Sequence, residues 1–139
     1  MSPMTLSPDL IRAEVAQFWN AFSSKDAARL EEFYAHESVG FGSVSTRSEP
    51  GRLAATRRKR EYFANSGAIR TQVSPVDVVM LSDHAGIACY TFQFHAMRTS
   101  SAGNQDEHIT NGRATQVFGF DPDGNIRIYH EHFSLPAGS

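Results

Sequence analysis

The hydrophobic residues of this chain change their spacing once, near residue 67, and that change limits the folds open to it. Before it, apolar residues recur every three or four positions, which is the period of a helix packed on a core. From Ile69 onward they alternate with polar residues, which is the period of a half-buried strand. Helices followed by a run of strands predict an α+β domain.

The first half of the chain predicts three helices. Ser7, Pro8 and Asp9 form a helix start, because Ser caps the helix, Pro fits its first turn and Asp suits its positive end. Asp26 is expected to cap the second helix, and residues 65–67 to end the third. The expected helices span residues 7–24, 26–36 and 53–65, with a strand at 38–43 and a loop at 46–51.

The second half predicts antiparallel strands at residues 69–82, 85–98, 108–120 and 125–134. The turn before the last strand is Asp121-Pro122-Asp123-Gly124. Pro presets its backbone angle, Asp bonds to the local backbone and Gly accepts a positive φ. The last two strands are therefore expected to form a hairpin.

At 139 residues the chain has the length of one domain. We expect that domain to span residues 7–135, with a disordered segment at 1–6 and a tail at 136–139. No run of about 18 apolar residues is present, so no membrane-spanning helix is expected.

Charge and cysteine content limit the partners and the compartment. Thirteen basic and fifteen acidic side chains give a net charge of −2, which removes the long-range attraction used by binders of nucleic acid or anionic membranes. Neither is expected as a partner. The first ten residues do not have the pattern of a secretory signal, and the single Cys89 cannot form an internal disulfide, so we expect a cytoplasmic protein. The basic run at residues 57–60 is interpreted as solvated helix surface, because consecutive helical residues point in different directions.

Three segments carry a resemblance to known families: residues 18–22 followed by Lys25-Asp26, residues 61–63, and the last predicted strand, residues 126–134. They read Phe-Trp-Asn-Ala-Phe, Glu-Tyr-Phe and Ile-Arg-Ile-Tyr-His-Glu-His-Phe-Ser. Together with the order of the elements, they resemble the SnoaL-like and ketosteroid-isomerase-like families of the nuclear transport factor-like superfamily. The last strand is also similar to that of the calcium/calmodulin-dependent kinase association domain. The resemblance covers nearly the whole chain and implies a cystatin-like cone, in which three helices pack in the concavity of a curved, mainly antiparallel sheet around a central pocket.

The catalytic groups of ketosteroid isomerases do not carry over. Alignment places Phe18 at that family's oxyanion-hole tyrosine, Phe41 at its general-base aspartate and Gln116 at its protonated aspartate. Neither phenylalanine can exchange a proton. The resemblance therefore implies a cone and a cavity, and not this reaction.

Strict alternation assigns an aromatic face to the last three strands. The residues expected on it are Ala88, Tyr90, Phe92, Phe94, Gln116, Phe118, Tyr129, Glu131 and Phe133. The expected ligand-binding residues are Phe18, Phe92, Phe94, Phe118 and Phe133, and the catalytic candidates are Glu131, Tyr129, Gln116 and Tyr90. A carboxylate among aromatic rings is costly to bury unless paired or protonated, so Glu131 is either an acid or base or reaches solvent at the mouth. The alternative is that the aromatic residues simply fill the core.

The opposite face carries His130 and His132. A His-x-His pair offers two metal ligands where a catalytic site takes three, so no metal is predicted. A register shifted by one residue would bring both histidines into the cavity as alternative acid or base groups. In the families that the chain resembles, this outer face is commonly a dimer interface, which implies a homodimer.

Two functions are compatible with these observations. The first is a small-molecule-binding protein whose aromatic pocket takes a small apolar substrate, with acid/base chemistry of an isomerase, cyclase or hydrolase type centred on Glu131. The second is a noncatalytic dimerisation or ligand-sensing module related to kinase association domains. The sequence has no phosphate loop, dinucleotide fingerprint or nucleophile elbow, and no cofactor is expected.

Overall fold

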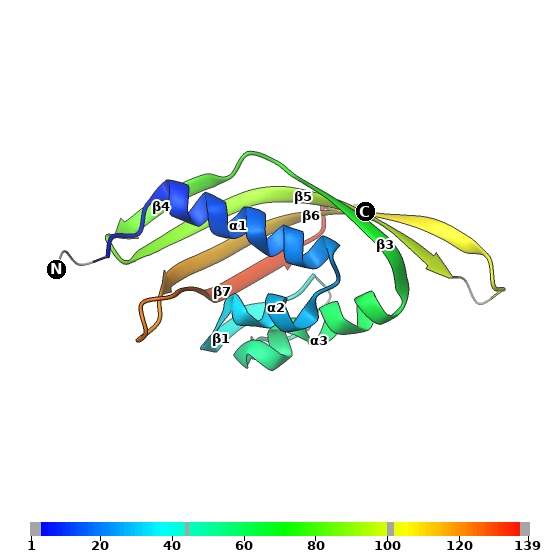
Figure 1. Ribbon diagram of the computed structural model, residues 1–139, viewed down its shortest axis with the longest axis horizontal. Helices are drawn as coiled ribbons and strands as arrows, with labels where there is room; N and C mark the ends of the chain where they lie inside the picture. Colours follow the sequence, from blue (N-terminus) through cyan, green and yellow to red (C-terminus); the bar gives the residue numbers. More distant parts are fainter. Residues whose placement is uncertain (1–3, 44, 100–101, 137–139) are drawn as a thin grey trace.

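The computed structural model describes residues 4–43, 45–99 and 102–136 (Figure 1). Parts of the expected N-terminal segment and C-terminal tail therefore lie outside the described residues. Leu6, expected to be disordered, is buried, and its N–H donates to the carbonyl of Asp83 at 2.7 Å. The expectation of disorder is thus wrong at Leu6, because an apolar side chain and a backbone donor both find partners on the sheet.

The helices are α1 (Pro8–Ser23), α2 (Ala27–Glu32) and α3 (Gly51–Ala64). The predicted caps are present: the Ser7 hydroxyl accepts from the N–H of Leu10, and the Asp26 carboxylate accepts from the N–H of Arg29. Among the described helices, none is both long and apolar enough to cross a membrane.

The strands are β1 (Tyr34–Phe41), β2 (Glu49–Pro50), β3 (Ser66–Val73), β4 (Asp77–Ser82), β5 (Ala85–Thr99), β6 (Gln105–Phe120) and β7 (Ile126–Ser134). They form one sheet in the order β2-β1-β7-β6-β5-β3, with β4 paired to the other end of β5. The pairing of β1 with β7 is parallel, and the other pairings are antiparallel. The α+β class and the mainly antiparallel sheet are confirmed.

Three predicted boundaries are wrong. The second helix ends at Glu32 and β1 starts at Tyr34, because the Phe33 carbonyl accepts from the N–H of Ile128 and Tyr34 pairs with Ile128. The predicted strand 69–82 is two strands, separated at Pro75, which cannot donate to a ladder. The predicted loop 46–51 contains β2 and the first residue of α3.

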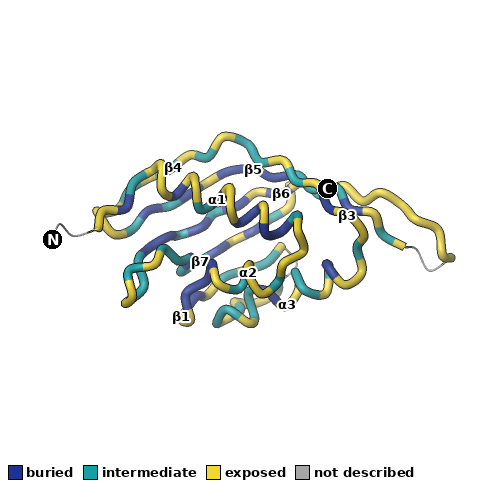
Figure 2. The backbone as a smooth tube through the Cα atoms, viewed as in Figure 1, coloured by how far each residue is buried: buried dark blue, intermediate teal, exposed yellow. Residues whose placement is uncertain are grey.

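The sheet curves, and the helices lie on its concave side (Figure 1). α1 crosses the long strands, whereas α2 and α3 lie near β1 and β7. Figure 2 shows buried segments on the sheet beneath α1 and exposed residues on the far ends of β5 and β6. The core is rich in aromatic residues because α1 and the inner sides of β5 and β7 both supply rings.

A bulge in β7 exchanges two predicted side-chain directions. Val117 pairs with His130, but the next residue of β6, Phe118, pairs with Ile128, so that Tyr129 has no opposite partner. Ile128, which strict alternation from His130 would place on the outer face, is fully buried in the core. The Tyr129 hydroxyl instead donates to the Phe120 carbonyl at 2.8 Å, and the prediction of Tyr129 on the inner aromatic face is wrong.

Candidate functional site

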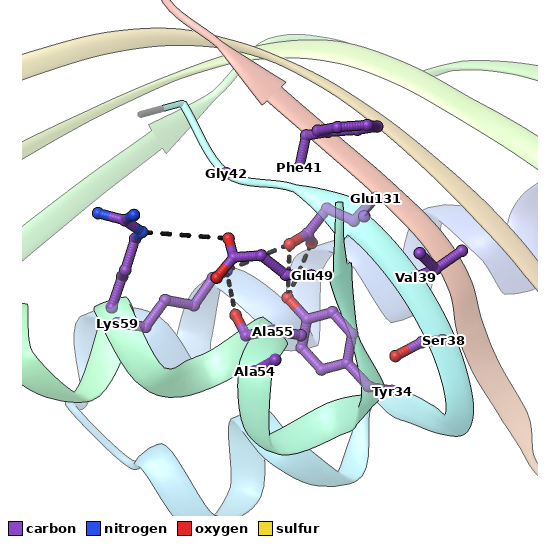
Figure 3. Close-up of a pocket in the computed structure, with 12 residues that line it drawn as sticks. Tyr34, Ser38, Val39, Phe41, Gly42, Glu49, Ala54, Ala55, Lys59 and Glu131 are labelled. Carbon is purple, nitrogen blue, oxygen red and sulfur yellow. Dashed lines mark hydrogen bonds and ion pairs between the residues drawn. The ribbon is translucent and has the colours of Figure 1, made fainter. Parts of the chain in front are cut away.

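Glu131 of β7 points into the concave side of the sheet and is only 6% exposed (Figure 3). The Tyr34 hydroxyl lies 2.9 and 2.7 Å from its two carboxylate oxygens. The Gln116 side-chain amide donates to Oε1 at 2.7 Å. The register explains these contacts, because Gln116 is directly opposite Glu131 on β6 and Tyr34 is on the neighbouring strand β1.

Lys59 completes the surroundings of this carboxylate from α3 (Figure 3). Its Nζ lies 3.1 Å from Oε2 of Glu131, in an ion pair whose side chains are 12% and 8% exposed. The same ammonium donates to the Ala55 carbonyl and lies over the rings of Phe133 and Tyr34, at 4.9 and 5.7 Å from their centroids. The charge is therefore held by a carboxylate, a helix carbonyl and two aromatic faces.

A chain of hydrogen bonds continues behind Gln116. Its Oε1 accepts from the Tyr90 hydroxyl at 2.6 Å, and the Tyr90 oxygen accepts from Nε1 of Trp19 at 3.0 Å. This chain requires the Gln116 amide to present its N–H to Glu131. The amide orientation is thus fixed by α1 through a bond that starts at Trp19.

Burial raises the pKa of the Tyr34 hydroxyl well above its usual value, and the charge of Glu131 acts in the same direction. Burial also raises the pKa of Tyr90, against the hydrogen bond from Trp19, which lowers it. Both hydroxyls therefore stay protonated in the neutral pH range and act as donors toward the buried carboxylate and amide.

Two cavities meet at Lys59. The smaller one, of about 40 Å³, is the pocket drawn in Figure 3, and Glu131, Glu49 and Ser38 line it. The Ser38 hydroxyl is buried without a hydrogen-bond partner among the described residues. The larger cavity, of about 140 Å³, has a mostly aromatic lining, with Arg58 and Lys59 as its charged members. Lys59 thus lines both the smaller cavity, which contains Glu49 and Glu131, and the larger aromatic cavity.

The structure brings together only part of the predicted site. Phe92, Phe94 and Phe133 line the larger cavity. Phe18 and Phe118 do not line it, because they are fully buried in the core. Glu131 lines the smaller cavity rather than the aromatic one, and its partner Lys59 reaches both.

The remaining catalytic candidates lie behind the cavity walls or away from them. Tyr90 and Gln116 are buried in the hydrogen-bond chain and line neither cavity. Tyr129 bonds to the backbone at the turn end of β6. His130 lies on the outer side, with its Nδ1 2.8 Å from the Val39 carbonyl, and His132 packs on Phe41. Among the residues that the structure describes, no three His, Cys, Asp or Glu side chains gather as a metal site would require.

Sequence reasoning missed Lys59 and the role of Tyr34. Lys59 was interpreted as part of a solvated basic run, but Thr56 and Phe63 are the buried residues of α3. Lys59 stands three positions after one and four before the other, so it shares their face. That spacing was the available signal. Tyr34 falls within the expected helix 26–36, but the early start of β1 places it on a strand, where its hydroxyl reaches Glu131.

Comparison with known proteins gives one family and a common fold. The model of the SnoaL-like domain matches residues 11–138. A search of curated proteins found no significant match.

Solved structures of the same fold cover almost the whole chain. A proposed calcium/calmodulin-dependent protein kinase II association domain from Xanthomonas campestris is 17% identical, with 99% of this chain and 97% of that chain covered and a TM-score of 0.72. A proposed dehydratase of the NTF2-like family from Streptomyces avermitilis is 16% identical, with 95% and 100% covered and a TM-score of 0.76. A proposed scytalone dehydratase from Novosphingobium aromaticivorans is 10% identical, with 93% and 91% covered and a TM-score of 0.78.

At these identities the likeness establishes the fold and not the activity. The family match, in contrast, spans nearly the full length, and the resemblance inferred from the sequence is confirmed. The chain belongs to the SnoaL-like domain family.

Proposed function

We propose that this SnoaL-like domain binds a small, mainly apolar organic molecule in the larger cavity and exchanges a proton with it through the Lys59–Glu131 pair. The observation that carries the proposal is the position of the Lys59 ammonium, which is paired with a buried carboxylate and also lines the aromatic cavity. An apolar pocket with a few fixed polar groups is the usual form of a small-molecule site.

Stability alone gives little reason to keep this pair. Removing two charges from water costs several kcal/mol per ion, and a well-packed apolar pair in the same place is often as stable or more stable. The Lys59–Glu131 pair is nevertheless held by Tyr34, Gln116 and Ala55. Several polar contacts that hold a buried ion pair beside a cavity favour a role of that pair in ligand binding or catalysis.

The pair can act on an oxygen atom of the ligand. The Lys59 ammonium donates a hydrogen bond to a carbonyl or hydroxyl oxygen and, when charge develops there, transfers its proton. Glu131 holds the ammonium in place, and Tyr34 and Gln116 stabilise the carboxylate. Isomerisation, cyclisation, hydration and dehydration all include such a proton transfer, and two proteins of similar structure are named as proposed dehydratases.

Native mass spectrometry of freshly purified protein tests the binding part of the proposal. We expect a copurified small molecule, and we expect toluene to change the fluorescence of Trp19, which is the single tryptophan and lines the cavity. In the variant Thr110→Phe, a larger side chain on the cavity wall fills part of the cavity, and this response is expected to be lost. No bound molecule and no response of Trp19 would contradict the proposal.

Turnover of the copurified compound tests the chemical part. Lys59→Met and Glu131→Gln are expected to abolish turnover, and Glu131→Gln is expected to keep ligand binding. Wild-type turnover in both variants would contradict the role of the pair, and no turnover in the wild type would limit the function to binding.

We further propose a homodimer joined through the outer face of the sheet. Support comes from apolar side chains that face solvent there: Val79 and Ile109 are 59% and 54% exposed, and Phe41 is 36% exposed. A second copy of the chain would remove them from water.

A further inference from the structure

The larger cavity has the size and lining for one aromatic ring. Its volume is about 140 Å³, and an apolar cavity of about 150 Å³ takes up benzene. The aromatic side chains that line it are Trp19, Phe22, Tyr62, Phe92, Phe94 and Phe133. Rings in such a space pack edge-to-face or offset on one another, so a planar ring is the shape that this lining favours.

The charges at this cavity are of one sign. Arg58 and Lys59 line it, and none of the described residues that line it is an aspartate or glutamate. Aromatic faces alone would also suit a cationic ligand, but two nearby cations repel one. The lining therefore favours a neutral or anionic ligand over a cationic one. Whether a neutral or an anionic ligand is favoured depends on how far the positive charges of α3 are neutralised by ion pairs.

The basic run of α3 carries more positive charge than its partners neutralise. Lys59 pairs with Glu131, and Arg60 pairs with Glu31. In the described part of the chain, Glu49 is the one acidic partner of Arg57 and Arg58: Arg57 Nη2 lies 3.4 Å from one of its oxygens, and Arg58 Nε lies 4.0 Å from the other.

Arg58 is the less well paired of the two arginines. Its terminal amino groups have no hydrogen-bond partner among the residues that the structure describes, and its side chain is 46% exposed. Glu49 also accepts a hydrogen bond from the Ser45 hydroxyl, which takes up part of its capacity. Arg58 thus lines the aromatic cavity and has terminal amino groups left to bind a ligand, and guanidinium groups bind carboxylates through two parallel hydrogen bonds.

We propose that the ligand of this cavity is a one-ring aromatic carboxylate, whose ring lies among the aromatic side chains and whose carboxylate binds Arg58. This inference rests on the proposed function and narrows it to a substrate class. Lys59 lines the same cavity, so its ammonium remains available to an oxygen substituent elsewhere on the ring.

Benzoate, benzamide and benzamidinium test the inference, because they have nearly the same shape and carry charges of −1, 0 and +1. Affinities are measured by calorimetry on the full chain, with Trp19 fluorescence reporting that each probe enters the cavity. We expect benzoate to bind at least about tenfold more tightly than benzamide, as one charge-assisted hydrogen-bonded pair would give. Benzamidinium is expected to bind most weakly.

Arg58→Gln identifies the anchoring group, and Arg57→Gln is its matched control, because Arg57 is the adjacent cation and does not line this cavity. We expect Arg58→Gln to bind benzoate no better than benzamide, and Arg57→Gln to keep the wild-type preference. Both positions are largely exposed, so both variants are expected to fold, which thermal unfolding checks.

Each other outcome has a definite meaning. Equal affinity of the wild type for benzoate and benzamide would overturn the carboxylate inference and leave the proposed function in place. A preference for benzoate that survives in Arg58→Gln would overturn the assignment to Arg58. Failure of all three probes, together with failure of toluene, would overturn the proposed function itself.

Discussion

Two carboxylates on the same sheet, Glu131 of β7 and Glu107 of β6, have similar partners and very different surroundings. Glu131 is held by Tyr34, Gln116 and Lys59 on the concave side. Glu107 lies 2.8 Å from Nδ1 of His95 and 3.1 Å from Nη2 of Arg70.

The two carboxylates differ in their exposure to solvent. The side chain of Glu131 is 8% exposed, whereas that of Glu107 is 45% exposed. Water can replace the partners of Glu107 when they are lost, but it cannot easily replace those of Glu131. A similar set of contacts is therefore expected to contribute far more to the stability of the fold on the inner side of the sheet. The predictions below test this comparison.

The largest expected effect is that of Glu131→Ala. Lys59, Gln116 and Tyr34 would each lose an acceptor inside the protein, and breaking a buried ion pair costs about 3–5 kcal/mol. Urea denaturation followed by circular dichroism measures the change in the free energy of unfolding.

Two variants serve as controls for that result. Glu107→Ala, the matched carboxylate on the exposed side, is expected to change stability little. The double variant Lys59→Met, Glu131→Leu is expected to recover much of the lost stability, because no unpaired charge remains. A single Glu131→Ala variant as stable as Glu107→Ala would remove the distinction between the two sides.

Val117→Asp tests the outer side as an interface. Val117 lies between Ile87 and His130 in the register of the sheet, at the centre of the outer face. In the proposed homodimer a carboxylate there would lose its water twice, across the twofold axis, and we expect the dissociation constant to rise by about 100-fold or more. Light scattering at micromolar concentration measures it, and a wild-type monomer would rule the dimer out.

Tyr34→Phe is expected to destabilise the protein by about 1–2 kcal/mol, because the buried carboxylate loses one donor but keeps Gln116 and Lys59. Tyr129→Phe is the matched control. It removes a hydroxyl that bonds only to the Phe120 carbonyl in a half-exposed position, and we expect about 0.5 kcal/mol. Thermal unfolding of both variants compares them, and equal losses would argue against a special role of the inner carboxylate.

The smallest expected effect concerns pH. The hydrogen bond from His95, with the charges of His95 and Arg70, lowers the pKa of Glu107 below its usual value. The unfolded chain then takes up this proton at a higher pH than the folded chain does. The contribution of Glu107 to stability is therefore present above the unfolded pKa and is lost as the pH falls through the folded pKa.

An NMR titration of the Glu107 side chain checks this direction. Its midpoint is expected to move up, toward the usual glutamate value, in His95→Gln and in concentrated salt. A midpoint that does not respond to either change would show that these neighbours do not set the pKa.

The features of the fold that depend on neighbouring residues could be predicted from the sequence. The inward direction of Glu131, Phe92 and Phe133 follows from strand alternation, which is a property of the backbone. The helix caps at Ser7 and Asp26 follow from side-chain chemistry within three residues.

The parts that could not be predicted depend on contacts between distant segments. The bulge at Tyr129 is not marked by glycine or proline, and it appears only when β7 pairs with β6. The end of α2 at Glu32 depends on pairing with Ile128. The spacing of Lys59 from Thr56 and Phe63 indicates its face of α3, but only the packing of α3 on β1 shows that its ammonium reaches a buried carboxylate.

The central claim is that a small molecule occupies the aromatic cavity with an oxygen atom at Lys59. A crystal structure of the protein with acetophenone, which carries one ring and one carbonyl oxygen, tests it most directly. We expect the ring against Trp19 and Phe133, and the carbonyl oxygen about 3 Å from the Lys59 Nζ. Acetophenone bound elsewhere, or a cavity closed by its own side chains, would contradict the account.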